Sequence, residues 1–239
     1  HRDREVAPQA GHEPIARRPG RPLVTVRHHP SQEILAAYAT GALADGPSLV
    51  AAVHLETCAS CRRAVGVFEA VGGALIEDMP AIDMAPLALD LALAQIERPE
   101  QRPAARPMKP DRRALVAGRL PPALRGRRIG VRRFLAPDLW VAHVGSNAPD
   151  RWRTYLLHAG KGRRLLQHGH LGAELTSVIY GAFRDETGLY GPGDFAEADE
   201  ALDHRPAVDG DGACLCLISA KGGVRARGLA RLLQPLLQV

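Results

Sequence analysis

The stretch GKGRRLLQHGHLGAELTSVIYGAF, residues 160–183, carries two histidines and a glutamate in a spacing that suits an extended strand. His168 and His170 are two residues apart, and Glu174 follows after a further even step. Because successive side chains of a strand point to opposite faces, these three can face one cation if the backbone stays extended. His204, after a turn-like stretch and an acidic stretch, is the natural fourth ligand by position. Such ligands suit zinc, iron, manganese or nickel, so the pattern predicts a metal site.

Short apolar runs separated by Gly, Pro and Asp surround this stretch. They are RRIGVRRFL, DLWVAHV, WRTYLLHAG, GRRLLQHGH, ELTSVIYGAF, GDFAEAD and ACLCLIS. Many short strands with turn signals between them predict an antiparallel sandwich or barrel. The final stretch, GLARLLQPLLQV, is expected to be a helix or strand packed on it.

A second set of possible ligands lies upstream, in VHLETCASCRR, residues 53–63. His54, Cys58 and Cys61 occupy positions i, i+4 and i+7, which share one face of an α-helix. Zinc prefers these ligand types, and one more histidine would complete a tetrahedral set. The candidates for that ligand are His28 and His29. A closed shell of four predicts a structural zinc that stabilises a small helical unit with a thin core. The alternative is two helix cysteines beside an unrelated histidine.

Three helices are expected around this second set. The first starts at Pro30 and ends before Gly41, the second begins near Pro47, and the third carries Val65 and Phe68. Proline suits the first turn of a helix, and the apolar residues recur at helical spacing. The sequence therefore predicts a compact three-helix unit.

A fourth helix is expected in PLALDLALAQIE, residues 86–97, which opens at Pro86. Leu87 and Leu91 form one apolar stripe, and a second stripe of Leu89, Leu93 and Ile96 lies about opposite. A helix that is apolar on two sides needs two burial partners. Two interpretations stay open: the helix is buried inside its own domain, or one face is kept for another protein.

Composition divides the chain into four segments. We expect a disordered tail at residues 1–23, a helical domain at 24–97, a Pro- and Arg-rich linker at 98–113 and a β domain at 114–239. Residues 28–97 hold nine acidic residues and two arginines, whereas residues 98–133 hold twelve basic and two acidic residues. The acidic segment would repel a phosphate backbone, so direct nucleic-acid binding by it is disfavoured.

The four cysteines fall in two close pairs, Cys58 with Cys61 and Cys214 with Cys216. Residues 1–21 carry no apolar stretch like that of a secretory signal, and no run approaches the roughly 18 apolar residues of a membrane-spanning helix. We therefore expect the protein to lie in the reducing cytoplasm and not to associate with a membrane. Cys214 and Cys216 share one face of a predicted strand, where packing in the core is favoured over a redox role.

The β half resembles the cupins. Gly162, His168, His170, Glu174 and Gly181 match the first cupin motif completely. The second cupin motif is matched in part, by Gly193 and Asp194, and without the usual asparagine. This resemblance implies a cupin-type barrel or sandwich. His158 is the alternative to His204 as the fourth ligand.

The stretch HHPSQEILAAYATGALADGPSLVAAVHLETCASCRRAVGVFEAVGGALIE looks like a zinc-binding anti-sigma domain. With the cupin-like half and its GAFRDETGLYGPGD, the chain resembles the ChrR-type anti-sigma factors from about Val26 onward. The resemblance implies an α+β protein of two domains, with about four helices before the cupin-type domain, and two Zn²⁺ sites. The implied ligands are His29, His54, Cys58 and Cys61 for the first site and His168, His170, Glu174 and His204 for the second.

The same resemblance implies a function. The protein would bind an extracytoplasmic-function sigma factor 1:1 in the cytoplasm and block its access to core RNA polymerase. The cupin-like half would be needed for release on singlet oxygen or organic peroxide. This predicts a regulator and not an enzyme. The main alternative is a cupin-type metal-dependent enzyme, a dioxygenase or isomerase, with an open position at the second site.

Overall fold

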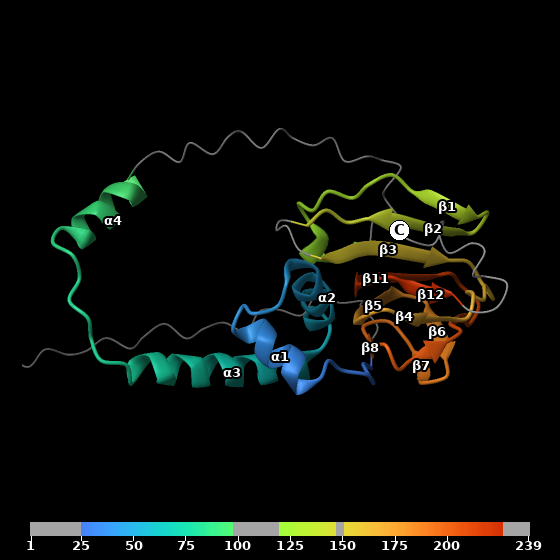
Figure 1. Ribbon diagram of the computed structural model, residues 1–239, viewed down its shortest axis with the longest axis horizontal. Helices are drawn as coiled ribbons and strands as arrows, with labels where there is room; N and C mark the ends of the chain where they lie inside the picture. The colour runs from blue at the N-terminus through green and yellow to red at the C-terminus, as the bar shows by residue number, and fades with distance from the viewer. Residues whose placement is uncertain (1–24, 98–119, 147–150, 227–239) are drawn as a thin grey trace, which may run out of the picture.

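In the computed structural model, residues 25–97, 120–146 and 151–226 are described, and they form a helical part followed by a β part (Figure 1). The expected tail, the expected linker and the stretch GLARLLQPLLQV lie outside these residues. The described part is α+β, as expected, with four α-helices preceding an antiparallel sandwich. No helix among these residues has the length and apolar character to cross a bilayer.

The helices begin and end close to the predicted positions. They are α1 Gln32–Ala39, α2 Asp45–Leu55, α3 Ala59–Glu77 and α4 Ala88–Glu97. The side chain of Ser31 caps α1 by accepting a hydrogen bond from the Ile34 N–H at 3.4 Å. The start predicted for the fourth helix, Pro86, was two residues early, because Leu87 adopts a left-handed conformation with φ 66°.

The β part contains a six-stranded antiparallel sheet in the order β1-β2-β3-β11-β5-β8 and two three-stranded sheets, β10-β6-β7 and β12-β4-β9. The strands are β1 Arg133–Ala136, β2 Leu139–His143, β3 Trp152–Ala159, β4 His168–His170, β5 Glu174–Tyr180, β6 Ala182–Asp185, β7 Gly188–Tyr190, β8 Phe195–Ala198, β9 Asp203–His204, β10 Ala207–Asp209, β11 Cys214–Lys221 and β12 Val224–Ala226. The sandwich predicted from the apolar runs is confirmed.

One predicted run, residues 174–183, is two strands and not one. The chain turns at Gly181, whose φ is +72°, and a Cβ there would overlap the carbonyl of Ala213. Only glycine fits this combination of left-handed backbone and close approach. The break sends β6 into a different sheet from β5.

Helix α2 is packed on the six-stranded sheet, and the main hydrophobic core forms between them. Leu49, Val50 and Val53 of α2 share one cluster with Leu215 and Leu217 of β11. Gly46 allows the close approach, because a Cβ at this position would overlap the hydroxyls of Thr154 and Ser219. The helical unit is therefore continuous with the core of the β part.

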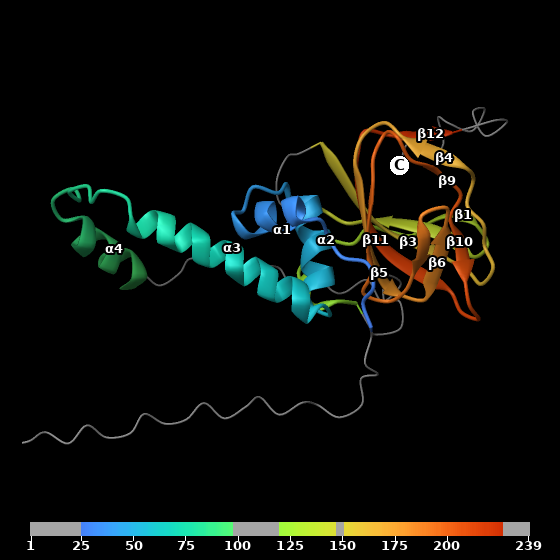
Figure 2. The ribbon, with the colours of Figure 1, turned by 90° about the horizontal axis from the view of Figure 1, so that it is seen from below.

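The expected compact three-helix unit is only partly formed. A smaller cluster contains Leu35 of α1 and Val65 of α3. The second half of α3 and all of α4 extend away from the β part (Figure 2), and none of the described side chains of α4 is buried. Helix α2 packs mainly on the six-stranded sheet and less on α1 and α3, because the sheet provides a larger apolar face.

Candidate metal centres

The first ligand cluster lies where the helical part meets the β part. One ligand atom from each of His29, His54, Cys58 and Cys61 lies within 4.8 Å of all the others. The Nδ1 atom of His29 is 3.3 Å from the Sγ atom of each cysteine. His29 is therefore the histidine that joins the predicted set, and His28 points elsewhere.

The premise that His54, Cys58 and Cys61 share one helical stripe is wrong. Helix α2 ends at Leu55, and Cys58 has an extended backbone, with φ −95° and ψ 102°, as the residue that caps α3. The Thr57 hydroxyl donates to the carbonyl of His54 at 3.0 Å within this turn. The three ligands converge because they come from the end of one helix and the start of the next.

The ring of His54 is fully buried. Its Nδ1–H donates to the carbonyl of Gly193 at 2.7 Å, while its Nε2 has no hydrogen-bond partner among the described residues. Burial lowers the pKa of His54 to about 4, so the ring is neutral and Nε2 carries a free lone pair. An orphaned buried nitrogen beside two thiols fits a metal ion.

The surroundings of the two thiols shift their pKa values in opposite directions. Burial by itself would raise the pKa of Cys58, but hydrogen bonds from the Ser60 hydroxyl and the backbone of Cys61 outweigh it and lower that pKa. Burial and the neighbouring Cys58 raise the pKa of Cys61 to about 12. The fold therefore makes Cys58 easier to ionise than Cys61, and a bound cation would favour ionisation of both.

The second cluster is made of His168, His170 and His204. Strand β4 pairs with β9, and this places His168 directly opposite His204. The Nε2 atom of His204 is 3.1 Å from the Nε2 atoms of both other histidines. Burial lowers the pKa of His168, and it lowers that of His170 to about 4. One ring nitrogen from each of the three histidines thus converges on one point, as a cation requires.

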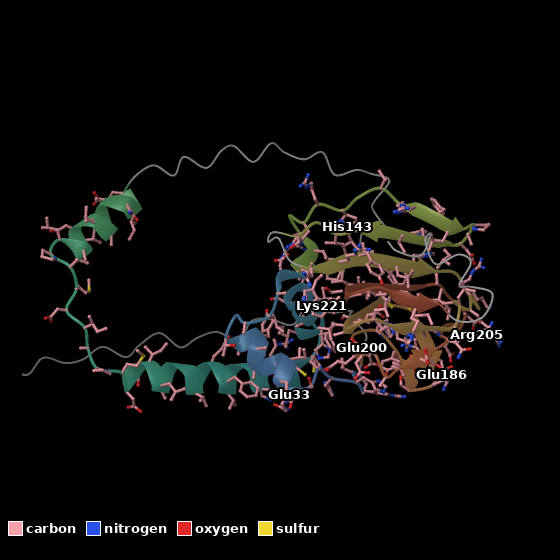
Figure 3. All side chains as sticks on the ribbon, in the orientation of Figure 1. Glu33, His143, Glu186, Glu200, Arg205 and Lys221 are labelled. Atoms are coloured by element: carbon pink, nitrogen blue, oxygen red, sulfur yellow. The ribbon has the colours of Figure 1, made fainter. Side chains whose placement is uncertain are left out.

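The outer nitrogens of this cluster are held by the protein. His204 Nδ1–H donates to Asp185 at 2.8 Å, and His168 Nδ1–H donates to the carbonyl of Leu166 at 2.8 Å. These contacts fix the tautomer that leaves Nε2 free. Asp185, the last residue of β6, is thus the outer partner of His204. The next residue, Glu186, accepts from the N–H of Arg205 at 2.9 Å, and both are labelled in Figure 3.

Glu174 lies beside the cluster and is not one of its three converging members. Its Oε2 is 3.7 Å from Nδ1 of His170, and it hydrogen-bonds Tyr155. Burial raises the pKa of Glu174 to about 7. His158, the alternative fourth ligand, stacks on Trp140 at 5.0 Å on the face of the sheet that α2 covers. It is therefore remote from the cluster.

A cavity of about 690 Å³ opens in front of the three histidines. Even-numbered residues of β11 line it, among them Cys216 and Ile218, while the odd-numbered Leu215 and Leu217 face α2. Cys214 and Cys216 are buried with their sulfurs 3.7 Å apart, and the hydrogen bond with Cys214, together with burial, raises the pKa of Cys216 well above its usual range. Both thiols pack in the wall of this cavity.

Sequence reasoning missed the contribution of the turn at residues 191–194. Gly193 binds His54, and Asp194, 2% exposed, accepts from the backbone N–H of Arg27 at 2.6 Å and of His28 at 3.0 Å. Burial would raise the pKa of Asp194, but these N–H groups and that of Gly191 outweigh it and lower that pKa. A GPGD turn alone indicated a loop and not these long-range contacts.

Together, the fold and the two clusters define a cupin-like protein with a helical N-terminal part that carries a His/Cys site. A family model described as the ChrR cupin-like domain matches residues 138–222. The chain is 38% identical over 223 residues to the anti-sigma-E factor ChrR of Cereibacter sphaeroides, covering 90% of this chain and 100% of that protein. The chain therefore belongs to the ChrR family of anti-sigma factors.

A solved structure supports the same assignment. The crystal structure of Rhodobacter sphaeroides SigE in complex with the anti-sigma ChrR contains a chain that is 34% identical, with a TM-score of 0.68. The match covers 82% of this chain and all of that one. The similarity extends beyond the cupin-like domain, because residues 138–222 alone are a much smaller share of the chain.

Proposed function

We propose that this protein binds an extracytoplasmic-function sigma factor 1:1 and keeps it from core RNA polymerase. The observation that carries the proposal is the apolar arm, residues 67–96, which comprises the later part of α3, the connection and α4. It contains twelve of the seventeen large apolar side chains that are exposed among the described residues. Single exposed apolar residues are ordinary, but a concentration on one extended element marks an interaction surface.

The shape and charge of the arm suit a clasp around a partner. Both stripes of α4 are open, as Leu91 on one stripe is 63% exposed and Ile96 on the other is 79% exposed. The interpretation that this helix is buried inside its own domain is not supported by the described residues. The nine acidic residues in residues 28–97 would steer the arm toward the basic surfaces with which a sigma factor binds DNA.

We further propose zinc at both clusters. At the first, His29, His54, Cys58 and Cys61 give a closed Cys2His2 set, whose role is structural because it leaves no open position. At the second, His168, His170 and His204 would bind the ion, with Glu174 as a fourth ligand once its carboxylate turns toward them. Bound zinc would contribute to folding stability at the first site, and at the second it would link strand β4 to strand β9.

We place the complex in the cytoplasm, where RNA polymerase works, and propose an oxidative signal such as singlet oxygen or organic peroxide as the trigger of release. Residues 24–97 would do the inhibiting, and the cupin-like domain at 114–239 would be needed for the response. No direct contact with nucleic acid or membrane is part of this function.

The test is transcription in vitro with the full chain, core RNA polymerase and the sigma factor encoded beside it. Equimolar protein is expected to abolish transcription from the promoters of that sigma factor and to co-elute with it. Transcription that continues, with no complex formed, would contradict the proposal. Substrate turnover by an iron-loaded second site would instead favour the rival enzyme, for which the cavity and the three histidines provide room.

A further inference from the structure

The first metal site draws its ligands from two different supports. Cys58 and Cys61 belong to the start of α3, whereas the contacts that hold the two histidines come from the β part. His29 lies in a segment, residues 26–31, that runs beside β8. The Phe195 N–H donates to the carbonyl of His28 at 3.1 Å, so the segment continues the hydrogen bonding of this edge strand.

Two carboxylates of the β part fasten the segment on either side of His29. Asp194 Oδ1 accepts from the N–H of Arg27 and of His28, and Glu197 accepts from Ser31 through its N–H at 2.6 Å and its hydroxyl at 3.1 Å. Hydrogen bonds to a charged acceptor are about twice as strong as neutral ones. The backbone that carries His29 is therefore fixed before any ion binds.

The same aspartate organises the turn that orients His54. Its Oδ2 accepts from the N–H of Gly191 at 2.8 Å, which closes the turn and directs the Gly193 carbonyl at Nδ1 of His54. Gly193 has φ +85°, and a Cβ there would lie 2.8 Å from the Thr57 hydroxyl. The turn thus fits closely against the loop between His54 and Cys58.

From these contacts we propose that the cupin-like domain supplies the outer shell of the first metal site and that Asp194 is its positioning residue. One carboxylate acts on both histidine ligands, on His29 through the backbone and on His54 through Gly193. The inference rests on the metal site proposed above. If the cupin-like domain supplies this outer shell, it helps the metal site to hold α2 against α3. Because the apolar arm continues from α3, the same contacts also support the arm.

The experiment follows cobalt in the full chain. Cobalt bound by Cys58 and Cys61 has a sulfur-to-cobalt charge-transfer band that a site of histidine and carboxylate lacks, so the band reports on the first site alone. The rate at which EDTA removes this band is measured for wild type, Asp194→Asn and the control Asp211→Asn. Asp211 is a matched control because its carboxylate is 99% exposed and pairs with Lys161.

Loss of an outer-shell partner costs about 10- to 100-fold in metal affinity, so Asp194→Asn is expected to release cobalt roughly tenfold faster or more. Asp211→Asn is expected to match wild type. Equal rates in all three proteins would overturn the inference while leaving the site itself intact. A wild-type protein with no thiolate band would instead overturn the proposed metal site.

Two further measurements keep the test decisive if Asp194→Asn does not fold. Glu197→Gln weakens only the clamp on Ser31 at the surface, and we expect faster cobalt release with unchanged helix content. In wild-type protein loaded with zinc, nitrogen NMR is expected to show His54 protonated at Nδ1 and bound through Nε2. The opposite tautomer, or unchanged release from Glu197→Gln, would refute the role given to the β part.

Discussion

The apolar arm makes a prediction that separates binding from folding. Leu89 and Leu93 lie one helical turn apart on the same stripe of α4, and both are exposed in the described structure. Replacing both by alanine removes apolar surface without removing a contact of the free protein. Because alanine has the higher helix propensity, the helix itself should persist. The expected effect is confined to the complex with the sigma factor.

The size of the effect follows from the exposed area. Burying a whole leucine side chain is worth about 1.5 to 3 kcal/mol. Leu89 is 63% exposed and Leu93 49% exposed, so about 1 to 2 kcal/mol of this burial is lost per truncation. The pair then accounts for about 2 to 4 kcal/mol, which weakens the complex roughly 30- to 1,000-fold at 1.4 kcal/mol per decade. Losses of this size are typical of interface hot spots.

The assay is calorimetric titration of the purified sigma factor into the full chain, with urea unfolding of the free protein beside it. The control is Leu166→Ala with Leu171→Ala, two leucines of similar exposure in the β part. We expect the arm variant to lose affinity at unchanged stability and the control to keep both. An arm variant that binds as wild type does, or a control that loses as much, would refute the assignment of this surface.

Three further outcomes are expected. Cys58→Ser should bind one zinc per chain where wild type binds about two, by elemental analysis, because the first set loses a thiolate. The folded pKa of Asp194 is below its ordinary value, so its stabilisation is present above about pH 4 and lost as the pH falls through the folded pKa. Wild type and Asp194→Asn should therefore converge in urea stability at low pH. Thr187→Val removes the hydroxyl that donates to Asp185 at 2.5 Å and lies 2.9 Å from the hydroxyl of Tyr190. Because Asp185 orients His204 of the second cluster, peroxide-triggered release should slow, while basal inhibition persists in the transcription assay.

Much of the local structure could be predicted from the sequence because local rules decided it. The alternation of His168 and His170 on one strand, and the turn signals between short apolar runs, depend on period 2 and on glycine, and the structure contains both. Helix α1 was predicted from Pro30, Gly41 and the apolar spacing between them, and it begins two residues after Pro30. These features need no knowledge of distant residues.

The rest depends on contacts between residues far apart in the sequence. Helical spacing placed His54 and Cys58 on one stripe, but the chain leaves the helix at Glu56, and the ligands converge through a turn instead. Asp185 reaches His204 across 19 residues, and Gly193 reaches His54 across 139. The cupin motif singles out Gly193 but not its contact with His54, and no pattern marks Asp185 as the partner of His204. The strands β6, β7, β9, β10 and β12 are too short for a clear apolar period.

The choice between His28 and His29 shows how the two parts of the protein share one site. Both residues precede Pro30, and only the adjacency of His29 to that proline favours it in the sequence. In the extended segment beside β8 their side chains point to opposite sides, as strand geometry requires. The ring of His28 lies 4.3 Å from that of Tyr190 and 3.4 Å from Asp194, which leaves His29 to face the cysteines. The strand of the cupin-like domain therefore selects the ligand, and the helical and cupin-like halves meet at the metal site itself.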